Sequence, residues 1–392
     1  MEENSMSNTP TQGDAIPTGT TGRAVLRRLL QAVALVIVCL VVLDGALRLV
    51  LPKTGLLRQT VDIQSPEMLY AQLEEFRRFD GVKIVTLGDS LVFGRTMRDH
   101  GDEDWQSHTL AAQLESRLAQ SRAGCPVMVA NFGMNGTLPA DLDELMRIIL
   151  PLKPDLVVFD LSLRSFSRDF EAEDKRYARP WLRDLSVSPD GRYQTAGSVS
   201  SFTDIGATYR DALVNHWYLY RMKDMIQAVA FDGQPAAFLT RTRDALDAKL
   251  KGEDGAAFGE DDLMLLFKAR ARYDGIDLEA DNPQRQALER LLGRLRDAAQ
   301  PAVGFYATED RERLEDLIER PRFDDLQAQL AGIMQDEGNK AEENVAWVGP
   351  LDVFNPDHYL DHVHLDRHGY GRLSDALLPQ VEAMLTKADL CQ

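Results

Sequence analysis

Hydrophobic residues are most concentrated near the N-terminus of the chain. Residues 29–51 are apolar apart from Gln31, Asp44 and Arg48. This stretch is long enough to cross a bilayer as a helix, and Arg48 can extend its charged end to the interface. The pattern predicts a single transmembrane anchor at 29–51, preceded by a polar tail at 1–28 that we expect to be disordered.

A cleaved signal peptide is the alternative interpretation of this segment. A cut after Ala46 would place Asp44 inside the recognition site, where small uncharged residues are preferred. Basic residues flank the apolar run on both sides in nearly equal number, so the positive-inside rule alone does not orient it. We predict an uncleaved helix, with the short tail inside the cell and the large domain outside.

Beyond the anchor, hydrophobic positions alternate between strand-like and helix-like spacing. A linker and a stalk helix are predicted at 52–80, with the helix at Pro66–Phe79. The first half of a core domain follows at 81–164. Its predicted strands are Val82–Leu87, Val127–Asn131 and Asp155–Leu161, and its predicted helices are Thr109–Ala119 and Leu142–Leu150.

The alternation breaks after Arg164 and returns near residue 300. Residues 165–300 contain helical segments and charged loops without a regular rhythm, which indicates a large, mainly helical insertion. The core resumes over 301–392, following a helix at 283–298. Its predicted elements are strands Ala302–Ala307 and Val345–Val348 and helices Arg311–Gln335 and Tyr370–Thr386. Such strand–helix alternation is typical of a three-layer α/β/α domain with a parallel sheet.

Charge and cysteine content narrow the functions to consider. The chain has 44 Lys and Arg against 62 Asp and Glu, a net charge of -18. Nucleic-acid binding needs a basic face, so we expect no nucleic-acid partner. The three cysteines, Cys39, Cys125 and Cys391, form neither a disulfide framework nor a zinc-binding spacing. Whether Cys125 and Cys391 form a disulfide bond in an oxidising compartment is left open by the sequence.

Two short motifs carry the candidate chemistry. Gly88-Asp89-Ser90 follows a predicted buried strand, at the carboxyl edge of the sheet where functional groups gather. Near the C-terminus, Asp361 precedes His364 within one turn. A serine hydroxyl needs a base to take its proton, and that histidine needs an acceptor on its second ring nitrogen. Ser90, His364 and Asp361 are therefore predicted to form a catalytic triad.

Two other interpretations of these residues stay open. Ser90 could be an ordinary helix N-cap. The His- and Asp-rich stretch 357–368 could hold a metal ion, although no second cluster of His or Cys accompanies it. We predict no metal and no organic cofactor.

The ordered motifs resemble those of the SGNH, or GDSL, hydrolases. In that family the Gly-Asp-Ser serine is the nucleophile, and an Asp-x-x-His pair before the last helix completes the triad. These positions fall on Ser90, Asp361 and His364. The family's glycine after the second strand, whose N–H lines the oxyanion hole with that of the serine, falls on Gly136. The resemblance covers the split core and implies a flavodoxin-like sheet and serine esterase chemistry.

One motif departs from the family pattern. The third strand should be followed by Gly-x-Asn-Asp, whose Asn donates to the oxyanion, but Arg164 stands where the Asn belongs. Either Ser162 or Arg164 replaces it as a donor, or turnover is low. We therefore place Arg164 with the Ser90 and Gly136 amides in the predicted oxyanion hole. Arg164 is also a candidate for reading a substrate carboxylate, since arginine binds carboxylates well.

The anchor, the altered third motif and the insertion together resemble the membrane-anchored SGNH proteins of bacterial exopolysaccharide O-acetylation. Those proteins are similar to the alginate O-acetyltransferase group. The resemblance implies an O-acyltransferase or esterase, a glycan or acylated polysaccharide substrate, and a multispanning membrane-bound O-acyltransferase as partner. It also implies the bacterial cytoplasmic (inner) membrane, with the domain on the periplasmic or extracellular side. The alternative is a catalytically weak, membrane-tethered glycan-binding or scaffold subunit.

The insertion supplies further candidate substrate-binding side chains. Trp217 and Tyr220 are predicted to contact substrate together with Arg164, and Arg176 and Arg179 add positive charge near the start of the insertion. We expect these residues to shape an acceptor groove that excludes water. A packing cap without any acceptor role is the alternative, because an aromatic run in a helix is commonly core.

Overall fold

The computed structural model describes residues 21–171, 177–188, 191–195, 202–231, 270–340, 344–388 and 390. Residues up to Val50 form one unit, and residues from Leu51 onward form a second. Most of the predicted disordered tail falls outside the described residues, as do Arg176 and Cys391. Whether Cys125 and Cys391 pair therefore stays open.

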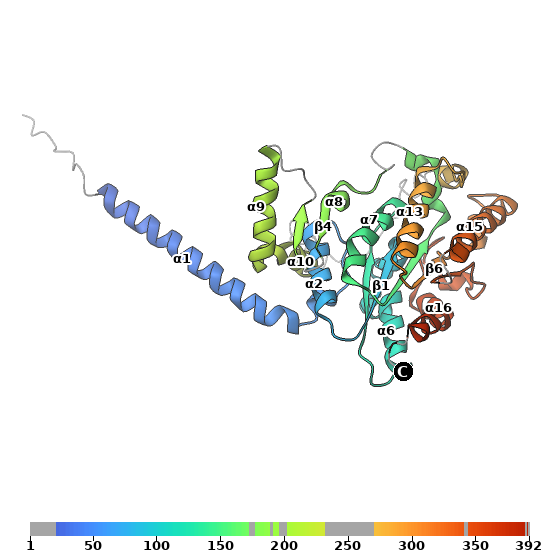
Figure 1. Cartoon of the computed structure of the whole chain (residues 1–392), viewed down its shortest axis with the longest axis horizontal. Helices are drawn as coiled ribbons and strands as arrows, with labels where there is room; N and C mark the ends of the chain where they lie inside the picture. The colour runs from blue at the N-terminus through green and yellow to red at the C-terminus, as the bar shows by residue number, and fades with distance from the viewer. Residues whose placement is uncertain are drawn as a thin grey trace, which may run out of the picture. The chain divides into compact units, whose positions relative to one another are not determined.

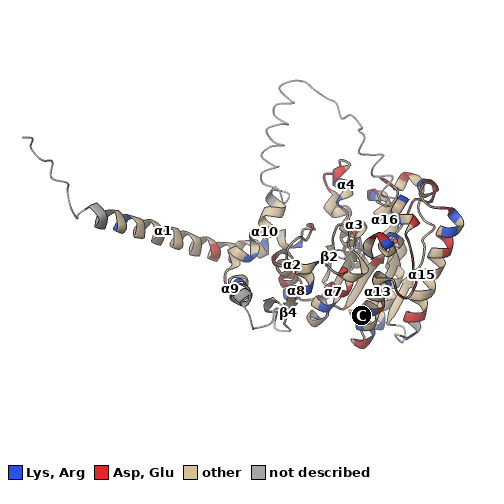
Figure 2. Ribbon diagram, turned by 90° about the horizontal axis from the view of Figure 1, so that it is seen from above, with Lys and Arg blue, Asp and Glu red and all other residues tan. Residues whose placement is uncertain are grey.

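The first unit is the helix α1 (Thr21–Val50). Within the described part of the chain, the segment Ala24–Lys53 is the one stretch long and apolar enough to cross a membrane. Figure 2 shows its long uncharged stretch, and Arg48 pairs with Asp44 at 2.8 Å near the end of the helix. Its length and composition suit either a single-pass membrane anchor or a signal sequence.

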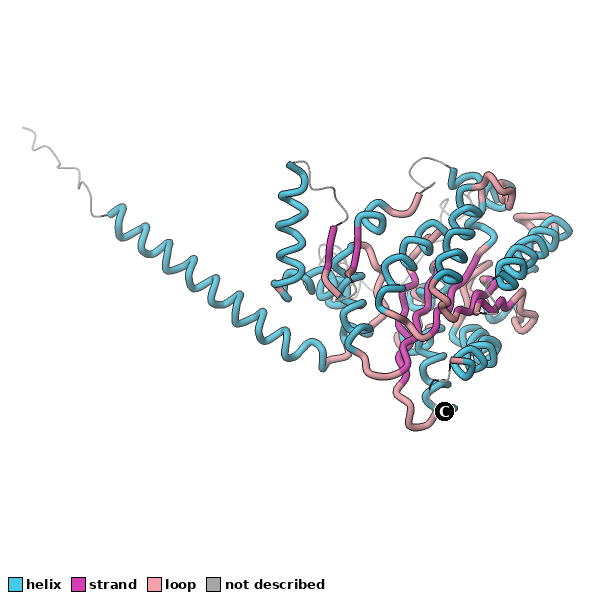
Figure 3. The backbone as a smooth tube through the Cα atoms, in the orientation of Figure 1, coloured by secondary structure: helices cyan, strands magenta, loops and turns pink. Residues whose placement is uncertain are grey.

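The second unit is built on a parallel sheet of five strands. They pair in the order β2-β1-β3-β6-β7, and Figures 1 and 3 show the sheet among its flanking helices. Their bounds are β1 Val82–Gly88, β2 Val127–Gly133, β3 Leu156–Leu161, β6 Ala302–Tyr306 and β7 Val345–Val348. The chain turns to opposite sides of β1 to form β2 and β3. The β1/β3 junction is thus a topological switch point, where ligands bind in open α/β sheets.

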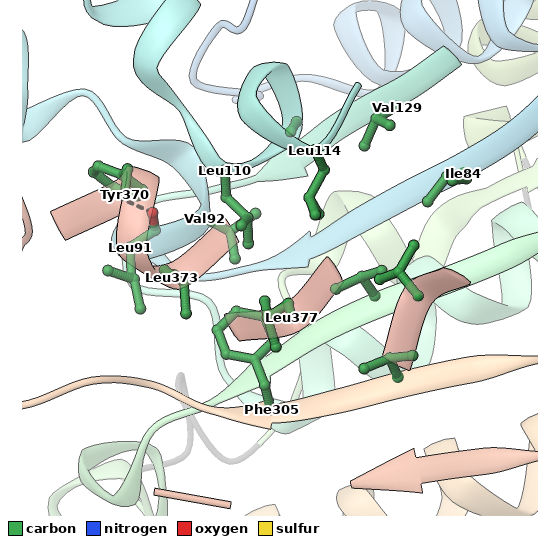
Figure 4. Packing of buried hydrophobic residues seen from close by; sticks show 14 of the residues in the cluster. Ile84, Leu91, Val92, Leu110, Leu114, Val129, Phe305, Tyr370, Leu373 and Leu377 are labelled. Carbon is green, nitrogen blue, oxygen red and sulfur yellow. Dashed lines mark hydrogen bonds between the residues drawn. The ribbon is translucent and has the colours of Figure 1, made fainter. Parts of the chain in front are cut away.

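Helices cover both faces of this sheet. Successive strand side chains point to opposite faces, so Ile84, Val158 and Phe305 share one core with helices α6 (Leu110–Ser121) and α16 (Arg367–Lys387) (Figure 4). Most intervening strand residues, among them Val85, Val157 and Phe159, are also buried, on the face where Figure 1 shows α7 (Pro139–Ile149) and α13 (Pro283–Asp297). Burial on both faces explains the continuous apolar runs of the strands. The predicted three-layer α/β/α class is confirmed.

The remaining helices connect these layers or belong to the insertion. Around β1 and β6 they are α3 Ser90–Phe93, α4 Thr96–Asp99, α5 Trp105–His108, α14 Arg311–Leu314 and α15 Arg320–Lys340. The insertion contains helices α8 Pro180–Asp184, α9 Phe202–His216 and α10 Tyr218–Phe231, with the antiparallel strands β4 Leu185–Val187 and β5 Tyr193–Thr195. The sequence pattern missed this strand pair, because three-residue strands are too short to show alternation.

The prediction of one helix at Arg311–Gln335 is wrong. The chain leaves helical structure after Leu314 and begins α15 at Arg320. Pro321 lies in the first turn of α15, where its missing N–H has no partner to lose. Proline in the interior of a longer helix would remove a hydrogen bond and clash with the preceding turn.

Helix α2 (Pro66–Arg78), predicted as a stalk, is instead packed into the domain against α10. Its acidic residues Glu67 and Glu74 are buried. Arg210 binds Glu67 at 2.6 Å, and Arg221 pairs with Glu74. Two of the acidic side chains that suggested a solvent-exposed helix therefore form ion pairs with the insertion.

We expect Leu373→Ala to destabilise the domain by about 2–5 kcal/mol, because its side chain is fully buried between α16 and the sheet. Denaturant unfolding of the purified chain in detergent measures the change. Arg372→Ala, at the adjacent exposed position, is the control and should stay within about 0.5 kcal/mol. Equal effects of the two substitutions would contradict the described core.

Candidate active site

The turn from β1 into α3 exposes Ser90 at the rim of the sheet. β1 ends at Gly88, and the Asp89 carboxylate caps α3 by accepting the Leu91 N–H at 2.8 Å. A Cβ at position 88 would lie 2.1 Å from Asp160 Oδ1, so only glycine fits there. Ser90 is thereby fixed as the first residue of α3, half-buried at the carboxyl end of β1.

A short loop before α16 holds Asp361 and His364. Tyr359 and Leu365 form an antiparallel bridge across its base, and the Leu360 N–H donates to the His364 carbonyl at 2.7 Å. Asp361 Oδ1 accepts the backbone N–H groups of Val363 and His364, each at 2.8 Å. The local turn therefore sets the orientation of the carboxylate before it meets any other segment.

The three residues of the predicted triad meet in one hydrogen-bonded chain. His364 Nε2 lies 2.7 Å from Ser90 Oγ, and His364 Nδ1 lies 2.6 Å from Asp361 Oδ2. Burial opposes ionisation of Asp361, but the hydrogen bond and charge of His364 and two backbone N–H donors outweigh it and lower its pKa. An ionised acceptor behind the imidazole leaves Nε2 able to take the serine proton.

The loop after β2 brings Gly136 to the same edge of the sheet. The Met134 N–H donates to the Gly88 carbonyl at 3.0 Å, and Asn131 Nδ2 donates to the Val92 carbonyl at 2.9 Å. Gly136 itself is exposed with a φ of 65°, a left-handed conformation that favours glycine. Its N–H has no acceptor in the described part of the chain, so it is available to a ligand.

Arg164 follows β3 and reaches the residue beside the serine. Its Nη2 donates to Asp89 Oδ2 at 3.1 Å, and its Nε donates to Ser162 Oγ at 3.1 Å. Burial disfavours its charge, but Asp89, Tyr273, Glu309 and Asp361 outweigh burial and raise its pKa. Arg164 is therefore a fixed cation, whose Nη1 has no acceptor among the described residues.

Several residues around Arg164 were not predicted from sequence. Asp160 is buried beneath Gly88, and its Oδ1 accepts the Asp89 N–H at 3.2 Å. Glu309 is buried just beyond β6, and Tyr273 donates to it at 2.7 Å. The sequence offered two clues to these residues. Asp160 is an acidic residue inside an otherwise apolar strand, and Glu309 is an acidic residue just after the end of a strand.

His362 is half-buried beside the triad, with its ring against that of Tyr273 at a centroid distance of 6.3 Å. Burial, assisted by the Arg164 charge, lowers the pKa of His362 to about 4. The imidazole is therefore neutral at physiological pH. Among the described residues, no group of three His, Cys, Asp or Glu side chains is arranged to hold a metal ion.

Only some of the proposed substrate-binding residues lie near the predicted site. Arg179 reaches the Gly136 loop, where it donates to the Asn135 carbonyl at 2.5 Å. Trp217 and Tyr220 stack on each other, with centroids 6.4 Å apart, at the start of α10, which packs on α2. Within the described part of the chain, no ring contact or hydrogen bond joins this pair to Ser90 or His364. Their role in substrate binding stays a prediction.

Among known proteins, the chain is similar to several solved structures. No family model and no curated protein matches the chain. A lipase/acylhydrolase from Enterococcus faecalis is 13% identical, with 77% of this chain and 96% of that one covered and a TM-score of 0.37. An alpha/beta hydrolase, LAE5, from the metagenome of Lake Arreo is 13% identical, with 79% and 99% covered and a TM-score of 0.36.

A third similar structure is a carbohydrate acetylesterase family member from Sinorhizobium meliloti. It is 15% identical, with 78% of this chain and 100% of that one covered and a TM-score of 0.33. At such identities and TM-scores, the assignment of a function depends on the geometry of the site itself.

Asp160 gives the site a pH-dependent effect on stability. Burial, reinforced by the Asp89 charge, raises its pKa well above the ordinary value, so the folded chain holds a proton that the unfolded chain releases. Stability contributed by this group therefore falls as pH rises above about 4, by about 1.4 kcal/mol per pH unit until the folded-state pKa is reached. We expect Asp160→Asn to remove that slope.

Urea unfolding of both proteins between pH 4.5 and 7 measures the difference. Asparagine keeps the Oδ1 acceptor for the Asp89 N–H, so the variant should fold and gain stability over the parent as pH rises. Identical pH slopes for the two proteins would show that Asp160 is ionised in the folded state.

Proposed function

We propose that the chain is a membrane-anchored serine esterase or O-acyltransferase of the SGNH type. The observation that carries this proposal is the hydrogen-bonded chain from Asp361 through His364 to Ser90. It lies at the β1/β3 switch point, and its residues match the family motifs in order. A serine that only capped a helix would need no imidazole on its hydroxyl.

The geometry supports a two-step acyl transfer. His364 Nε2 takes the proton of Ser90 Oγ as the oxygen attacks the carbonyl carbon of an acyl ester. The ester C–O bond then breaks, and His364 returns the proton to the leaving alcohol, which leaves an acyl-serine. A second hydroxyl, from water or a sugar, loses its proton to His364 and attacks the acyl-serine. The bond between the acyl carbon and Ser90 Oγ then breaks, and His364 returns the proton to Ser90.

The negative charge of each tetrahedral intermediate needs donors held in advance. We assign this role to the backbone N–H groups of Ser90 and Gly136 and to Arg164. The Ser90 N–H is at the start of α3, and the Gly136 N–H is free of protein acceptors in the described region. Arg164 stands at the β3 end with Nη1 available, and it supplies a charged donor in place of the family's Asn.

The substrate we propose is an acyl ester, acetyl in the first instance, on a glycan outside the cytoplasm. The apolar helix α1 supports a single-pass anchor in a bacterial cytoplasmic membrane. An anchored domain on the outer side would meet polysaccharide as it leaves the membrane, beside a multispanning acyltransferase that supplies the acyl group. Arg164, Trp217 and Tyr220 remain the candidate glycan contacts.

Substitution of the triad tests the mechanism. We expect Ser90→Ala and His364→Ala each to lower kcat for p-nitrophenyl acetate by about 10⁴-fold or more, with Asp361→Asn the mildest of the three. Because the triad acts as a unit, the double variant Ser90→Ala/His364→Ala should be little worse than either single variant. Release of p-nitrophenol in steady state measures each rate.

The matched control is His368→Ala, an exposed histidine in the first turn of α16. It should keep the parent activity, and so should the parent protein in a metal chelator. Full activity in Ser90→Ala would overturn the mechanism, and loss of activity on chelation would favour a metal site.

Labelling in intact cells tests the membrane orientation. A cysteine placed by Gln380→Cys, at an exposed position of α16, should react with a membrane-impermeant maleimide when the outer membrane is permeable. The parent chain provides the background from its native cysteines. Labelling of the variant above background only after lysis would place the domain in the cytoplasm and remove the polysaccharide substrate from consideration.

A further inference from the structure

A cavity of about 350 Å³ lies near the end of α3 in the described part of the chain. The segments that line it are residues 59–65 before α2, the turn between α3 and α4, the start of α5, and α10. In α10 the lining residues Asp224, Gln227 and Ala228 follow the i, i+3, i+4 spacing of one helix face. Binding sites for small molecules have volumes of about 300–1,000 Å³, so this cavity has room for a sugar unit.

The cavity adjoins both segments that carry the predicted nucleophile and oxyanion donors. Phe93, in its wall, is the last residue of α3, and Ser90 is the first. Three residues of α-helix rise by about 4.5 Å, so the cavity begins about one turn from the nucleophile. Asp62, in another wall, accepts a hydrogen bond from Asn135 Nδ2 at 3.2 Å, and Asn135 directly precedes Gly136. A ligand in the cavity would therefore lie next to the groups that carry out the proposed reaction.

Hydrogen bonds join the walls of the cavity to one another. Ser65 Oγ donates to Asp224 Oδ2 at 2.8 Å, which ties the segment 59–65 to α10. The side-chain amide of Gln106 donates to the Thr60 carbonyl at 3.4 Å, which ties the same segment to α5. A site whose walls are already joined loses little conformational freedom when a ligand binds.

The lining combines buried apolar side chains with polar groups that donate and accept hydrogen bonds. Met68, Phe93 and Trp105 are buried, and the two aromatic rings meet edge to face with their centroids 5.9 Å apart. Asp62 and Gln64 are more exposed and supply a carboxylate and an amide. A sugar ring presents C–H groups and hydroxyls that both donate and accept, so it matches such a lining. A long acyl chain would instead bury these polar groups without partners, which costs free energy.

The charged side chains of the lining balance one another. Two are acidic, Asp62 and Asp224, and two are basic, Arg95 and Arg98. An anionic sugar would meet the two carboxylates as well as the two guanidinium groups, so the lining has no net charge to attract it. This balance favours a neutral sugar, in contrast to the basic groove that the arginines at the start of the insertion suggested.

We propose that this cavity binds a neutral sugar unit of the glycan, beside the unit that carries the acyl group. The inference rests on the proposed function, because it takes the glycan as the bearer of the ester. Two of the walls, 59–65 and α10, lie outside the core that resembles the SGNH hydrolases. Within the described part of α10, the face with Asp224 and Ala228 lines the cavity, and Trp217 and Tyr220 do not.

Filling the cavity tests the proposal on the full chain in detergent. Ala228 is half-buried, and Ala228→Trp would place a large ring in the cavity without removing a polar side chain. We expect KM for acetate release from O-acetylated xylotriose or cellotriose to rise about tenfold or more relative to KM for p-nitrophenyl acetate, because the small ester does not extend into the cavity.

Ala331→Trp is the matched control for this substitution. Ala331 is half-buried on α15, which packs on β7 at the edge of the sheet away from β2, so the ratio of the two KM values should stay at the parent level. The same ratio in Ala228→Trp and Ala331→Trp would overturn the proposal. So would a selective loss of p-nitrophenyl octanoate hydrolysis in Ala228→Trp, because the cavity would then hold the acyl chain.

Removal of one polar group should have a smaller effect. Gln64→Ala takes away an amide that donates to Asp62 at 3.0 Å, and the KM ratio should rise about fivefold, as expected for the loss of one hydrogen bond to the sugar. Gln329→Ala is its control, because Gln329 is likewise exposed and donates to Asp325 at 2.8 Å. An unchanged ratio in Gln64→Ala would remove the amide from the proposed site.

Sugar binding to an inactive variant separates this site from the catalytic mechanism. Ser90→Ala, in a polyoxyethylene detergent that has no sugar headgroup, should bind xylotetraose or cellotetraose in calorimetry. Ser90→Ala/Ala228→Trp should bind it about tenfold more weakly or less. No binding of either tetrasaccharide, equal affinity in the two proteins, or tighter binding of tetragalacturonate would refute the neutral-sugar site alone. Full esterase activity in Ser90→Ala would instead refute the proposed function.

Discussion

The parallel pairing of β1 with its neighbours β2 and β3 is the constraint on which the site depends. Parallel strands bring their carboxyl ends to one edge, so the segments that carry Gly136, Ser90 and Arg164 leave the sheet at the same edge although each follows a different strand. The approach of the segments is close. A Cβ on Gly133 would lie 2.4 Å from the Phe93 nitrogen. A larger residue there would push α3 away from β2 and separate the nucleophile from its predicted oxyanion donors.

Asp89 converts this proximity into a fixed geometry. One carboxylate oxygen caps α3 and the other accepts Arg164, so a single side chain sets both the helix that carries the nucleophile and the cation from the next strand. Asp89 is itself held from below, because its N–H donates to Asp160 Oδ1 at 3.2 Å, and burial raises the pKa of Asp160 well above its ordinary value. Asp89 and other acidic groups outweigh the burial of Arg164 and raise its pKa, so the guanidinium stays a cation. The arrangement suits a cation that must stay in place while negative charge forms beside it.

Those parts of the fold and of the site that depend on local sequence could be predicted from the sequence alone. Strands buried on both faces are mostly apolar, and Asp361 and His364 lie in one turn, so both could be recognised without tertiary information. Residues whose role comes from distant contacts could not. The charges of α2 suggested a free stalk because Arg210 and Arg221 come from the insertion. The sequence around Tyr273 gives no sign of its position, since only the pairing of Ile276 with Ser167 brings its segment beside the residues that follow Arg164. Pro321 was a local clue to the start of α15 that helical periodicity concealed.

Covalent labelling with a fluorophosphonate, followed by peptide mass spectrometry, tests the central claim most directly. We predict one phosphonylated residue, Ser90, because His364 and Asp361 activate that hydroxyl alone. Labelling should disappear in His364→Ala, where Ser90 is present but has no base. Absence of any adduct on Ser90 in the parent chain, or equal labelling of Ser90 in His364→Ala, would contradict the account.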